Sequence, residues 1–346
     1  MKRVLAPLLA RFMVGAPAAL LAACAPLVER PGPAVAPPRL HDYFFHAADG
    51  AALPYRVWMP DDANPKAAIV ALHGFNDYGN FFEMPGEYLR RRGVVSYAYD
   101  QRGFGATSKA GLWPGSDALK DDLRAFARLA RARHPGIPLY LLGESMGGAV
   151  ILAAGAEAPL EADGAILSAP AVWGRIAMPW YQKLALWLGA HATPWAKVTG
   201  RGLDITPSDN VEMLLALGRD PLVIKETRVD AIHGLVGLMD EALDSAPRFQ
   251  APALVLYGQK DEVIPKAPTR LMLERLPDSV IRPPTGGTRR ARQRVAFYQD
   301  GYHMLLRDLG AEIPWRDIEA WIADASSPLP SGADRVSADV ALGAAR

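Results

Sequence analysis

Ser145 is the residue whose surroundings most clearly indicate chemistry. It stands at the centre of Gly143-Glu144-Ser145-Met146-Gly147-Gly148, between the apolar runs 139–142 and 149–154. Glycines in a G-x-S-x-G pattern permit a sharp turn from a strand into a helix, which a side chain would block. Such a turn projects the hydroxyl into a cleft beside the first N–H groups of the helix. The pattern therefore predicts Ser145 as a nucleophile.

His303 is the candidate for the base that a serine hydroxyl needs before it can attack. Where this motif occurs, the chain order is nucleophile, acid and histidine. His303 is one of seven histidines, follows Ser145, and comes soon after the apolar run 295–298. We therefore predict His303 as the general base. His191 and His233 fall in a segment without strand patterns and can at most contact a substrate.

Asp261 is the candidate for the acid that orients the histidine. It lies in the loop that follows the apolar run 253–257. A carboxylate at this place would hold the imidazole in one tautomer and stabilise the imidazolium formed during attack. The neighbouring Glu262 is an alternative acid, and an ion pair with Lys260 is an alternative role for Asp261.

Two backbone N–H groups are candidates for stabilising the oxyanion of an acyl-transfer reaction. One belongs to Phe75 in His73-Gly74-Phe75, directly after the apolar run 67–72, and the other to Met146, directly after the nucleophile. The side chain of His73 is predicted to be structural.

Positioning these residues requires strands that end where the functional loops begin. Six short apolar runs stop at turn-forming or polar residues: 67–72, 94–99, 139–142, 164–168, 253–257 and 295–298. Uninterrupted apolar runs are typical of strands buried on both faces of a parallel sheet. Residues 116–134 repeat large apolar residues at helical spacing. The alternation predicts an α/β fold with a mostly parallel, doubly wound sheet, whose carboxyl edge binds ligands.

Strand patterns are missing between residues 169 and 246. Proline and tryptophan are frequent there, and four of the eight tryptophans are Trp173, Trp180, Trp187 and Trp195. We predict an inserted helical cap over 169–246 and a core formed by 41–168 and 247–325. A small second domain with these tryptophans in its core is the alternative.

The N-terminus is typical of an export signal. Lys2 and Arg3 precede the apolar run 12–22, which is too short to span a bilayer as a helix. The run ends in Leu21-Ala22-Ala23-Cys24, which resembles the lipobox of bacterial lipoproteins, where a cysteine after the cleavage site carries lipid. We expect a signal peptide over 1–23 and a lipid on Cys24. An ordinary secretory signal with an incidental cysteine is the alternative.

A lipid on Cys24 implies attachment to a membrane of a bacterial cell envelope. Ala25 follows the cysteine, which by analogy favours the outer membrane. Residues 24–40 are rich in proline and alanine and predict an extended tether. Residues 326–346 are small and polar, and we expect a poorly ordered tail.

Composition excludes several classes of function. The 38 Lys and Arg nearly balance the 37 Asp and Glu, so no net field attracts nucleic acid. The single cysteine excludes an internal disulfide and a multi-cysteine zinc site. Metal-ligand spacings, phosphate loops and dinucleotide fingerprints are missing from the sequence, so we expect no cofactor and no metal. The oligomeric state stays open.

The order of motifs resembles that of monoacylglycerol lipases and lysophospholipase-like α/β hydrolases, which include serine aminopeptidase S33-type hydrolases. The likeness covers residues 41–325 and rests on 73–75, 100–105, 143–148, the Asp261 loop and 302–303. It implies an α/β-hydrolase fold and hydrolysis of a monoacylglycerol or lysophospholipid through an acyl-serine intermediate. Residues 282–294 lengthen the connection between Asp261 and His303 and are predicted as a loop. Its basic residues are either solvated or close to anionic lipid.

Two other functions fit the same residues. A proline-releasing peptidase of the same fold needs cap acids that hold a free amine, and the cap contains Asp230, Asp240, Glu241 and Asp244. A catalytically silent, lipid-binding lipoprotein is the second alternative, although intact nucleophile, base and acid candidates argue against it.

Overall fold

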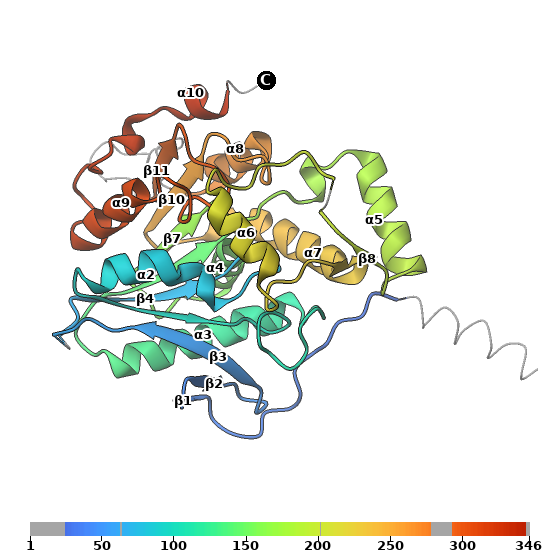
Figure 1. The fold of residues 1–346 in the computed structure, drawn as a ribbon, viewed down its shortest axis with the longest axis horizontal. Coiled ribbons are helices and arrows are strands. Elements are labelled where there is room, and N and C mark those ends of the chain that lie inside the picture. Colours follow the sequence, from blue (N-terminus) through green and yellow to red (C-terminus); the bar gives the residue numbers. More distant parts are fainter. Residues whose placement is uncertain (1–24, 63, 201, 278–292, 344–346) are drawn as a thin grey trace, which may run out of the picture.

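The protein is built around one large central sheet with helices on both sides (Figure 1). The computed structural model describes residues 25–62, 64–200, 202–277 and 293–343. The sheet has nine strands in the order β1-β2-β3-β5-β4-β6-β7-β10-β11. These are β1 (Arg39–His41), β2 (Phe44–His46), β3 (Ala52–Trp58), β4 (Ala67–Leu72), β5 (Val94–Tyr99), β6 (Leu139–Glu144), β7 (Gly164–Ser168), β10 (Ala253–Gly258) and β11 (Gln293–Tyr298).

Six strands, β5, β4, β6, β7, β10 and β11, run parallel to one another, as the apolar runs predicted. Every residue of β4, β5, β6, β7 and β10 is buried, because helices cover both faces of the sheet. Strands β1, β2 and β3 form an antiparallel edge that the sequence patterns did not reveal. Strand β11 begins at Gln293, so the last two residues of the predicted 282–294 loop are strand; residues 282–292 lie outside the described residues.

Two apolar cores lie on the two faces of the sheet. Helices α3, α4, α7 and α8 contribute to one core, and α2 and α9 contribute to the other. The helix bounds are α2 (Glu83–Arg90), α3 (Ser116–Arg133), α4 (Met146–Glu157), α7 (Val229–Ser245), α8 (Lys266–Arg275) and α9 (Glu312–Ala323), with 3-10 turns η1 (Gly79–Phe82) and η3 (Ala246–Arg248). This arrangement confirms the predicted doubly wound α/β fold.

The segment predicted as the cap contains two structurally different parts. Its first part leaves the sheet after β7 and holds α5 at one side of the molecule (Figure 1). Its last helix, α7, packs on α4 and buries Leu238, Ala242 and Leu243 in the core. Apolar residues at this helical spacing form one face, which α7 packs against α4, so α7 belongs to the core and the cap ends before it. The cap elements are η2 (Arg175–Ala177), α5 (Trp180–Ala192), β8 (Lys197–Val198), α6 (Val211–Arg219) and β9 (Thr227–Arg228), with β8 and β9 paired antiparallel.

Both terminal segments lie against the domain over their described residues. The Glu29 N–H donates to the Trp113 carbonyl at 2.8 Å and the Val35 N–H to the Ala48 carbonyl at 2.7 Å, so residues 25–38 are extended but do not form a free tether. The tail contains η4 (Ala333–Arg335) and α10 (Ala338–Leu342), and Leu329 and Ala341 are buried. The expectation of a poorly ordered tail is therefore wrong for residues 326–343, because these apolar side chains, spaced among polar ones, find room on the core.

None of the helices in the described ranges is both long enough and apolar enough to cross a bilayer. The predicted signal peptide, residues 1–23, and the predicted lipidation site, Cys24, lie outside the described residues.

The packing of the tail predicts the effect of Leu329→Ala on stability. Leu329 is 2% exposed, so its truncation should lower the free energy of unfolding by about 2–5 kcal/mol in denaturant titration. Val340→Ala is the matched control, because Val340 is 76% exposed in the same segment. Equal stabilities of both variants and wild type would show that the tail does not contribute to the core.

Candidate active site

Ser145 stands on a strained turn between β6 and α4. Its φ of 51° lies in the region that residues other than glycine rarely adopt. The turn is tight: a Cβ on Gly143 would lie 2.4 Å from the carbonyl carbon of Gly147, and one on Gly147 would lie 2.3 Å from the Leu72 carbonyl oxygen. Only glycine fits both positions, which explains the spacing of the motif.

Neighbouring backbone holds the strained serine in place. The Ser145 N–H donates to the Ser168 carbonyl at 2.9 Å, and the Ala171 N–H donates to the Ser145 carbonyl at 2.9 Å. Both partners belong to β7 or the chain just after it. The strain at the turn is therefore offset by bonds to the adjacent strand, and the side chain remains available for chemistry.

His303 and Asp261 meet at the carboxyl edge of the sheet. The distance between His303 Nδ1 and Asp261 Oδ2 is 2.9 Å. The other carboxylate oxygen of Asp261 accepts the N–H groups of Val263 and Ile264 at 2.8 and 2.9 Å. Both side chains are almost fully buried, so the orientation of the imidazole is fixed by the loop that follows β10.

Glu262, the alternative acid, and Lys260, the alternative partner of Asp261, each interact with other residues. Glu262 accepts the Thr206 N–H at 2.7 Å, and Lys260 pairs with Asp300 at 2.8 Å. The carboxylate that bonds the imidazole is therefore that of Asp261.

The surroundings of His303 change its basicity. Burial lowers the pKa of His303, but the charge and hydrogen bond of Asp261 outweigh burial, with a contribution from Glu144, and the net pKa is raised above 6.5. A raised pKa means that the imidazole accepts a proton more readily, which suits a general base.

The hydroxyl of Ser145 makes no hydrogen bond to the described residues, including His303. The structure thus contains the acid–histidine pair but not the serine–histidine bond. Catalytic hydrogen bonds are often long or poorly aligned in unliganded enzymes and tighten when substrate binds.

The predicted oxyanion donors lie around the serine. A Cβ on Gly74 would lie 3.4 Å from Ser145 Cβ, which places the loop carrying Phe75 against the nucleophile. Met146 is the first residue of α4, and the first N–H groups of a helix have no partner within it. The N–H groups of Phe75 and Met146 thus come from neighbouring segments at the carboxyl edge of the sheet.

His73 holds the loop before Phe75 and takes no part in the acid–histidine pair. Its Nε2 accepts the Gln101 N–H at 2.9 Å, so its Nδ1 carries the proton and donates to the Gly74 carbonyl at 2.7 Å. Burial lowers the pKa of His73 and keeps it neutral. This confirms the predicted structural role.

The cap is seated on the same loop. Asn76 Nδ2 donates to Thr227 Oγ1 at 2.6 Å, and the Asn76 carbonyl accepts the Ile224 N–H at 2.9 Å. The Tyr78 hydroxyl donates to Asp220 Oδ2 at 2.6 Å. Sequence patterns could not reveal these contacts, because they join residues about 150 positions apart.

Sequence reasoning also missed a buried charge cluster beneath the site. Arg307 lies between Asp77 and Glu144, at 2.8 and 2.7 Å. The available signals were the acidic residue inside the serine motif and a basic residue four positions after His303.

Among the described residues, one group of carboxylates has metal-like spacing, away from the triad candidates. Asp117, Glu157 and Glu241 come together between α3, α4 and α7. The ammonium of Lys120 lies 2.9 Å from Asp117 and 2.5 Å from Glu241 and also pairs with Glu157. A cation of the chain itself therefore satisfies these acids.

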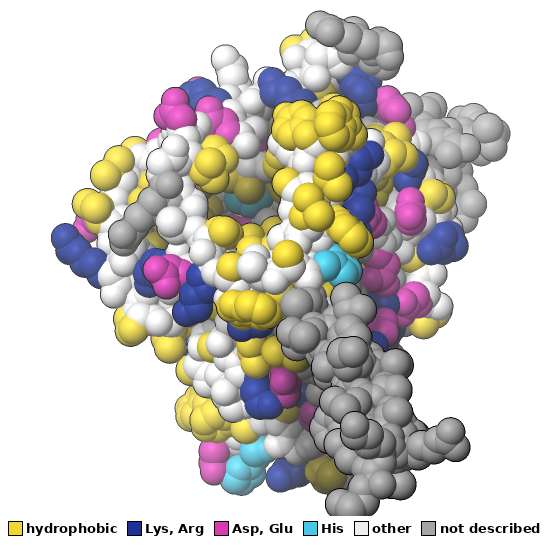
Figure 2. All heavy atoms as spheres, turned by 90° about the vertical axis from the view of Figure 1, so that its right-hand side faces the viewer, with side chains coloured by type: hydrophobic (Ala, Val, Ile, Leu, Met, Phe, Trp, Pro, Cys, Tyr) yellow, Lys and Arg dark blue, Asp and Glu magenta, His cyan; other side chains and the backbone are white. Residues whose placement is uncertain are grey.

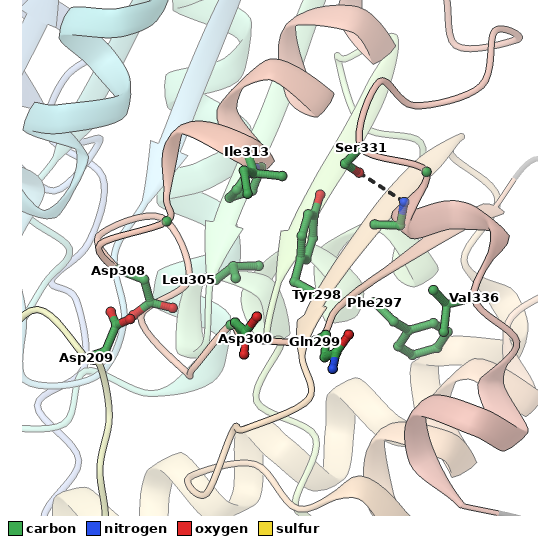
Figure 3. A pocket seen from close by; sticks show the side chains of 15 residues that line it. Asp209, Phe297, Tyr298, Gln299, Asp300, Leu305, Asp308, Ile313, Ser331 and Val336 are labelled. Atoms are coloured by element: carbon green, nitrogen blue, oxygen red, sulfur yellow. Dashed lines mark hydrogen bonds between the residues drawn. The ribbon is translucent and has the colours of Figure 1, made fainter.

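A cavity of about 460 Å³ lies beside the histidine loop but is not lined by Ser145, Asp261 or His303. Figure 3 shows Leu305 and Ile313 facing it from the histidine loop and α9, with Val336 of the C-terminal segment on the opposite side. It is a space left by the packing of the C-terminal segment and contains none of the predicted site residues.

The raised pKa of His303 predicts the pH dependence of turnover with an activated ester. Protonation removes the base, so kcat/KM should fall below a midpoint above 6.5. In Asp261→Asn the midpoint should move to lower pH, because the charge that raises the pKa is gone, and kcat should fall about 10⁴-fold. Glu262→Gln is the control and should leave both unchanged. An unchanged midpoint in Asp261→Asn would contradict the assignment of the pair.

Comparison with known proteins places the chain in a family. The family model described as serine aminopeptidase, S33, matches residues 63–310. A monoacylglycerol lipase of Mycolicibacterium smegmatis is 27% identical over 300 residues, which is 81% of this chain and 96% of that protein. The monoglyceride lipase of Homo sapiens is 24% identical over 292 residues, with 80% and 88% covered.

Solved structures show the same fold. A soluble variant of monoglyceride lipase from Saccharomyces cerevisiae, in complex with a substrate analog, has a TM-score of 0.66 at 20% identity and covers 88% of this chain and 99% of its own. The monoacylglycerol lipase of Paleococcus ferrophilus has a TM-score of 0.64 at 20% identity, with 79% and 99% covered. With the fold shared and the family model spanning well over half of its length, the chain belongs to the serine aminopeptidase S33 family of α/β-hydrolases and is a hydrolase of the serine esterase type.

Proposed function

We propose that the protein hydrolyses carboxylic esters of single-chain lipids, monoacylglycerols or lysophospholipids, through an acyl intermediate on Ser145. The observation that carries the proposal is the buried His303–Asp261 pair at the edge where the strained turn presents Ser145. The names of the relatives, monoacylglycerol and monoglyceride lipase, support the substrate class.

In the proposed acylation step, Ser145 Oγ attacks the ester carbonyl carbon while His303 Nε2 takes the hydroxyl proton. Asp261 stabilises the resulting imidazolium through Nδ1. The carbonyl oxygen becomes an oxyanion, which accepts the N–H groups of Phe75 and Met146. The intermediate then collapses: the bond to the alcohol breaks, and His303 returns its proton to the leaving alkoxide.

Deacylation repeats the step with water in place of serine. His303 removes a proton from water, the hydroxide attacks the acyl carbon, and the same N–H groups hold the oxyanion. Release of the fatty acid breaks the bond to Ser145 Oγ, which regains the proton from His303. The same imidazole accepts and donates every proton in the cycle, so a pKa near the working pH suits both its role as a base and its role as an acid.

The exposed surface of the cap favours lipid esters over water-soluble ones. Figure 2 shows apolar side chains gathered over the face that carries α5, beside a hollow in the surface. On one side of α5, Trp180 is 72% exposed and Trp187 is 54% exposed. We call this surface the cap apolar surface; it comprises Ile176, Trp180, Tyr181, Leu184, Trp187, Leu188 and Trp195. A patch of this kind marks an interaction with apolar partners such as a lipid surface.

The peptidase alternative needs acids beside the cap that are free to bind an amine. The four candidates all lie on α7, which belongs to the core, and they are already paired. Asp230 pairs with Arg228, Asp240 with Arg175, Glu241 with Lys120, and Asp244 with Arg275. A substrate amine would have to displace an arginine or lysine at each of them. This observation favours the ester substrate.

Substrate panels test the proposal directly. The protein should hydrolyse monoacylglycerols and acyl p-nitrophenyl esters but not proline amides, and Ser145→Ala should lose at least about 10³-fold in kcat. A fluorophosphonate should label wild-type Ser145. If the wild-type protein were no more active than Ser145→Ala on every ester, and if the fluorophosphonate did not label it, the silent, lipid-binding alternative would hold instead.

We also propose that the protein is anchored in the bacterial cell envelope, at the outer membrane, through a lipid on Cys24. The residues that follow Cys24 support an orientation in which one side of the protein faces the membrane. Leu27 N–H donates to Asp230 Oδ2 at 3.4 Å, at the start of α7, and α7 packs against α5. The chain thus emerges beside the helix that carries the cap apolar surface. An anchor and an apolar surface on the same side would hold the cap against the bilayer.

Two variants separate the anchor from the cap apolar surface. Cys24→Ser should lose incorporation of labelled palmitate. Trp180→Ser with Trp187→Ser should reduce binding of the unlipidated protein to phospholipid vesicles and turnover of vesicle-borne monoacylglycerol, while turnover of p-nitrophenyl acetate stays at wild-type level. Palmitate incorporation in Cys24→Ser would exclude the anchor. Undiminished vesicle binding in the double variant would exclude the cap apolar surface as the contact.

A further inference from the structure

One buried guanidinium joins three of the four segments that carry the candidate catalytic groups. Arg307 lies four residues after His303 on the same loop and is 4% exposed. Its Nη2 forms an ion pair with Asp77 Oδ2 at 2.8 Å and donates a hydrogen bond to Glu144 Oε1 at 2.7 Å. Both carboxylates are buried as well. A single nitrogen thus holds two acids from different parts of the chain.

Each of the two acids is close in sequence to a group of the proposed reaction. Asp77 comes two residues after Phe75, and its N–H closes the turn on the Gly74 carbonyl at 3.3 Å. Glu144 directly precedes Ser145 at the end of β6. Arg307 therefore links the oxyanion loop, the nucleophile and the loop of the general base at one point.

If stability were its only role, a buried charge cluster would be an unfavourable choice in free energy for filling this space. Removing charges from water costs more than an isolated ion pair returns, and apolar residues of similar volume often stabilise a core as well or better. Arginine has a planar group whose N–H donors have fixed directions. Directional donors can fix the relative positions of the three segments more precisely than apolar packing, which has no preferred direction.

We propose that Arg307 is a positioning residue for the acyl-transfer reaction: it holds the oxyanion loop and the nucleophile in register with His303 by bonding Asp77 and Glu144. The proposal rests on the proposed function and deepens it.

The charges of the cluster also face the base. The charged groups acting on His303 are Asp261 from the loop after β10, Glu144 from the end of β6, and Arg307 from its own loop. Glu144 raises the pKa of His303 and Arg307 lowers it, both less than Asp261 raises it. Loss of either charge therefore moves the pH profile in a direction that a purely structural defect does not produce.

Arg102 provides a matched control elsewhere in the fold. Its guanidinium is also largely buried and also pairs with two carboxylates, Asp49 at 2.8 Å and Asp122 at 2.5 Å. Its partners lie in the turn before β3 and in α3, and neither adjoins Ser145, Phe75 or His303 in sequence. A general effect of weakening a buried arginine pair should appear at both sites, and a kinetic effect only at Arg307.

The test compares Arg307→Lys and Arg102→Lys in the full-length protein, with the acyl p-nitrophenyl ester that wild type turns over fastest. Lysine keeps the charge but loses the planar pair of donors. We expect similar losses in Tm, a kcat reduced on the order of 10²-fold only in Arg307→Lys, and little change in KM. Wild-type kcat in a folded Arg307→Lys, or equal kcat losses in both variants, would overturn the proposal.

Two further variants test the charges. Arg307→Met should move the acidic limb of kcat/KM to higher pH, and Glu144→Gln, which retains an oxygen that can accept from Arg307, should move it to lower pH. If Arg307→Met does not fold, Glu144→Gln decides: a limb at lower pH supports the proposal and an unmoved limb overturns it. All of these comparisons require that wild type hydrolyses the ester. An inactive wild-type protein would therefore contradict the proposed function, whereas the variants test only the role of Arg307.

Discussion

The close approach of a helix to a strand carbonyl is the constraint on which the site depends. Helix α4 can start beside β4 only because Gly147 lets the Leu72 carbonyl oxygen come within a distance that no side chain would tolerate. The same crowding forces Ser145 into its unusual φ, at a cost of about 1–3 kcal/mol. Bonds to β7 and the following chain offset that cost. Every other part of the proposed mechanism is placed relative to this turn.

Polar groups at the carboxyl ends of parallel strands meet because the strands end at the same edge. Phe75 follows β4, Ser145 follows β6, Asp261 follows β10 and His303 follows β11. Local patterns were sufficient to predict this, since each strand is a continuous apolar run and each loop begins with a turn residue. The sequence pattern favoured Asp261 but left Glu262 as an alternative, and only the hydrogen bond to His303 separates them, because a shift of one residue in a loop changes the direction of a side chain but not the pattern.

Features that depend on contacts between distant residues could not be read from the sequence. The antiparallel strands β1 and β2 have only three residues each, and the longer β3 mixes polar and apolar residues, so no apolar run reveals them. Helix α7 follows the cap helices in a stretch without strand patterns, and only its packing on α4 places it in the core. The tail is polar on average, yet the few apolar side chains within it, Leu329 among them, occupy space on the sheet-covering helices. The position of Arg307 four residues after His303 and that of Glu144 inside the serine motif were visible, but their pairing was not, because the partners come from segments far apart in the chain.

The cap is a contiguous insertion between β7 and α7, and its attachment to the core has an evolutionary consequence. The first part of the insertion can be exchanged, so specificity can diverge while the chemistry stays constant. One boundary lies at Thr206 and Pro207: the Thr206 N–H donates to Glu262 beside the acid, and the Pro207 carbonyl accepts the Met304 N–H beside the base. A second boundary lies at Asp220 and Thr227, whose bonds reach Tyr78 and Asn76 beside the oxyanion loop. A transplanted cap that lacks these contacts would loosen the loops that carry the candidate catalytic groups. Modularity in this protein therefore ends well before the insertion does.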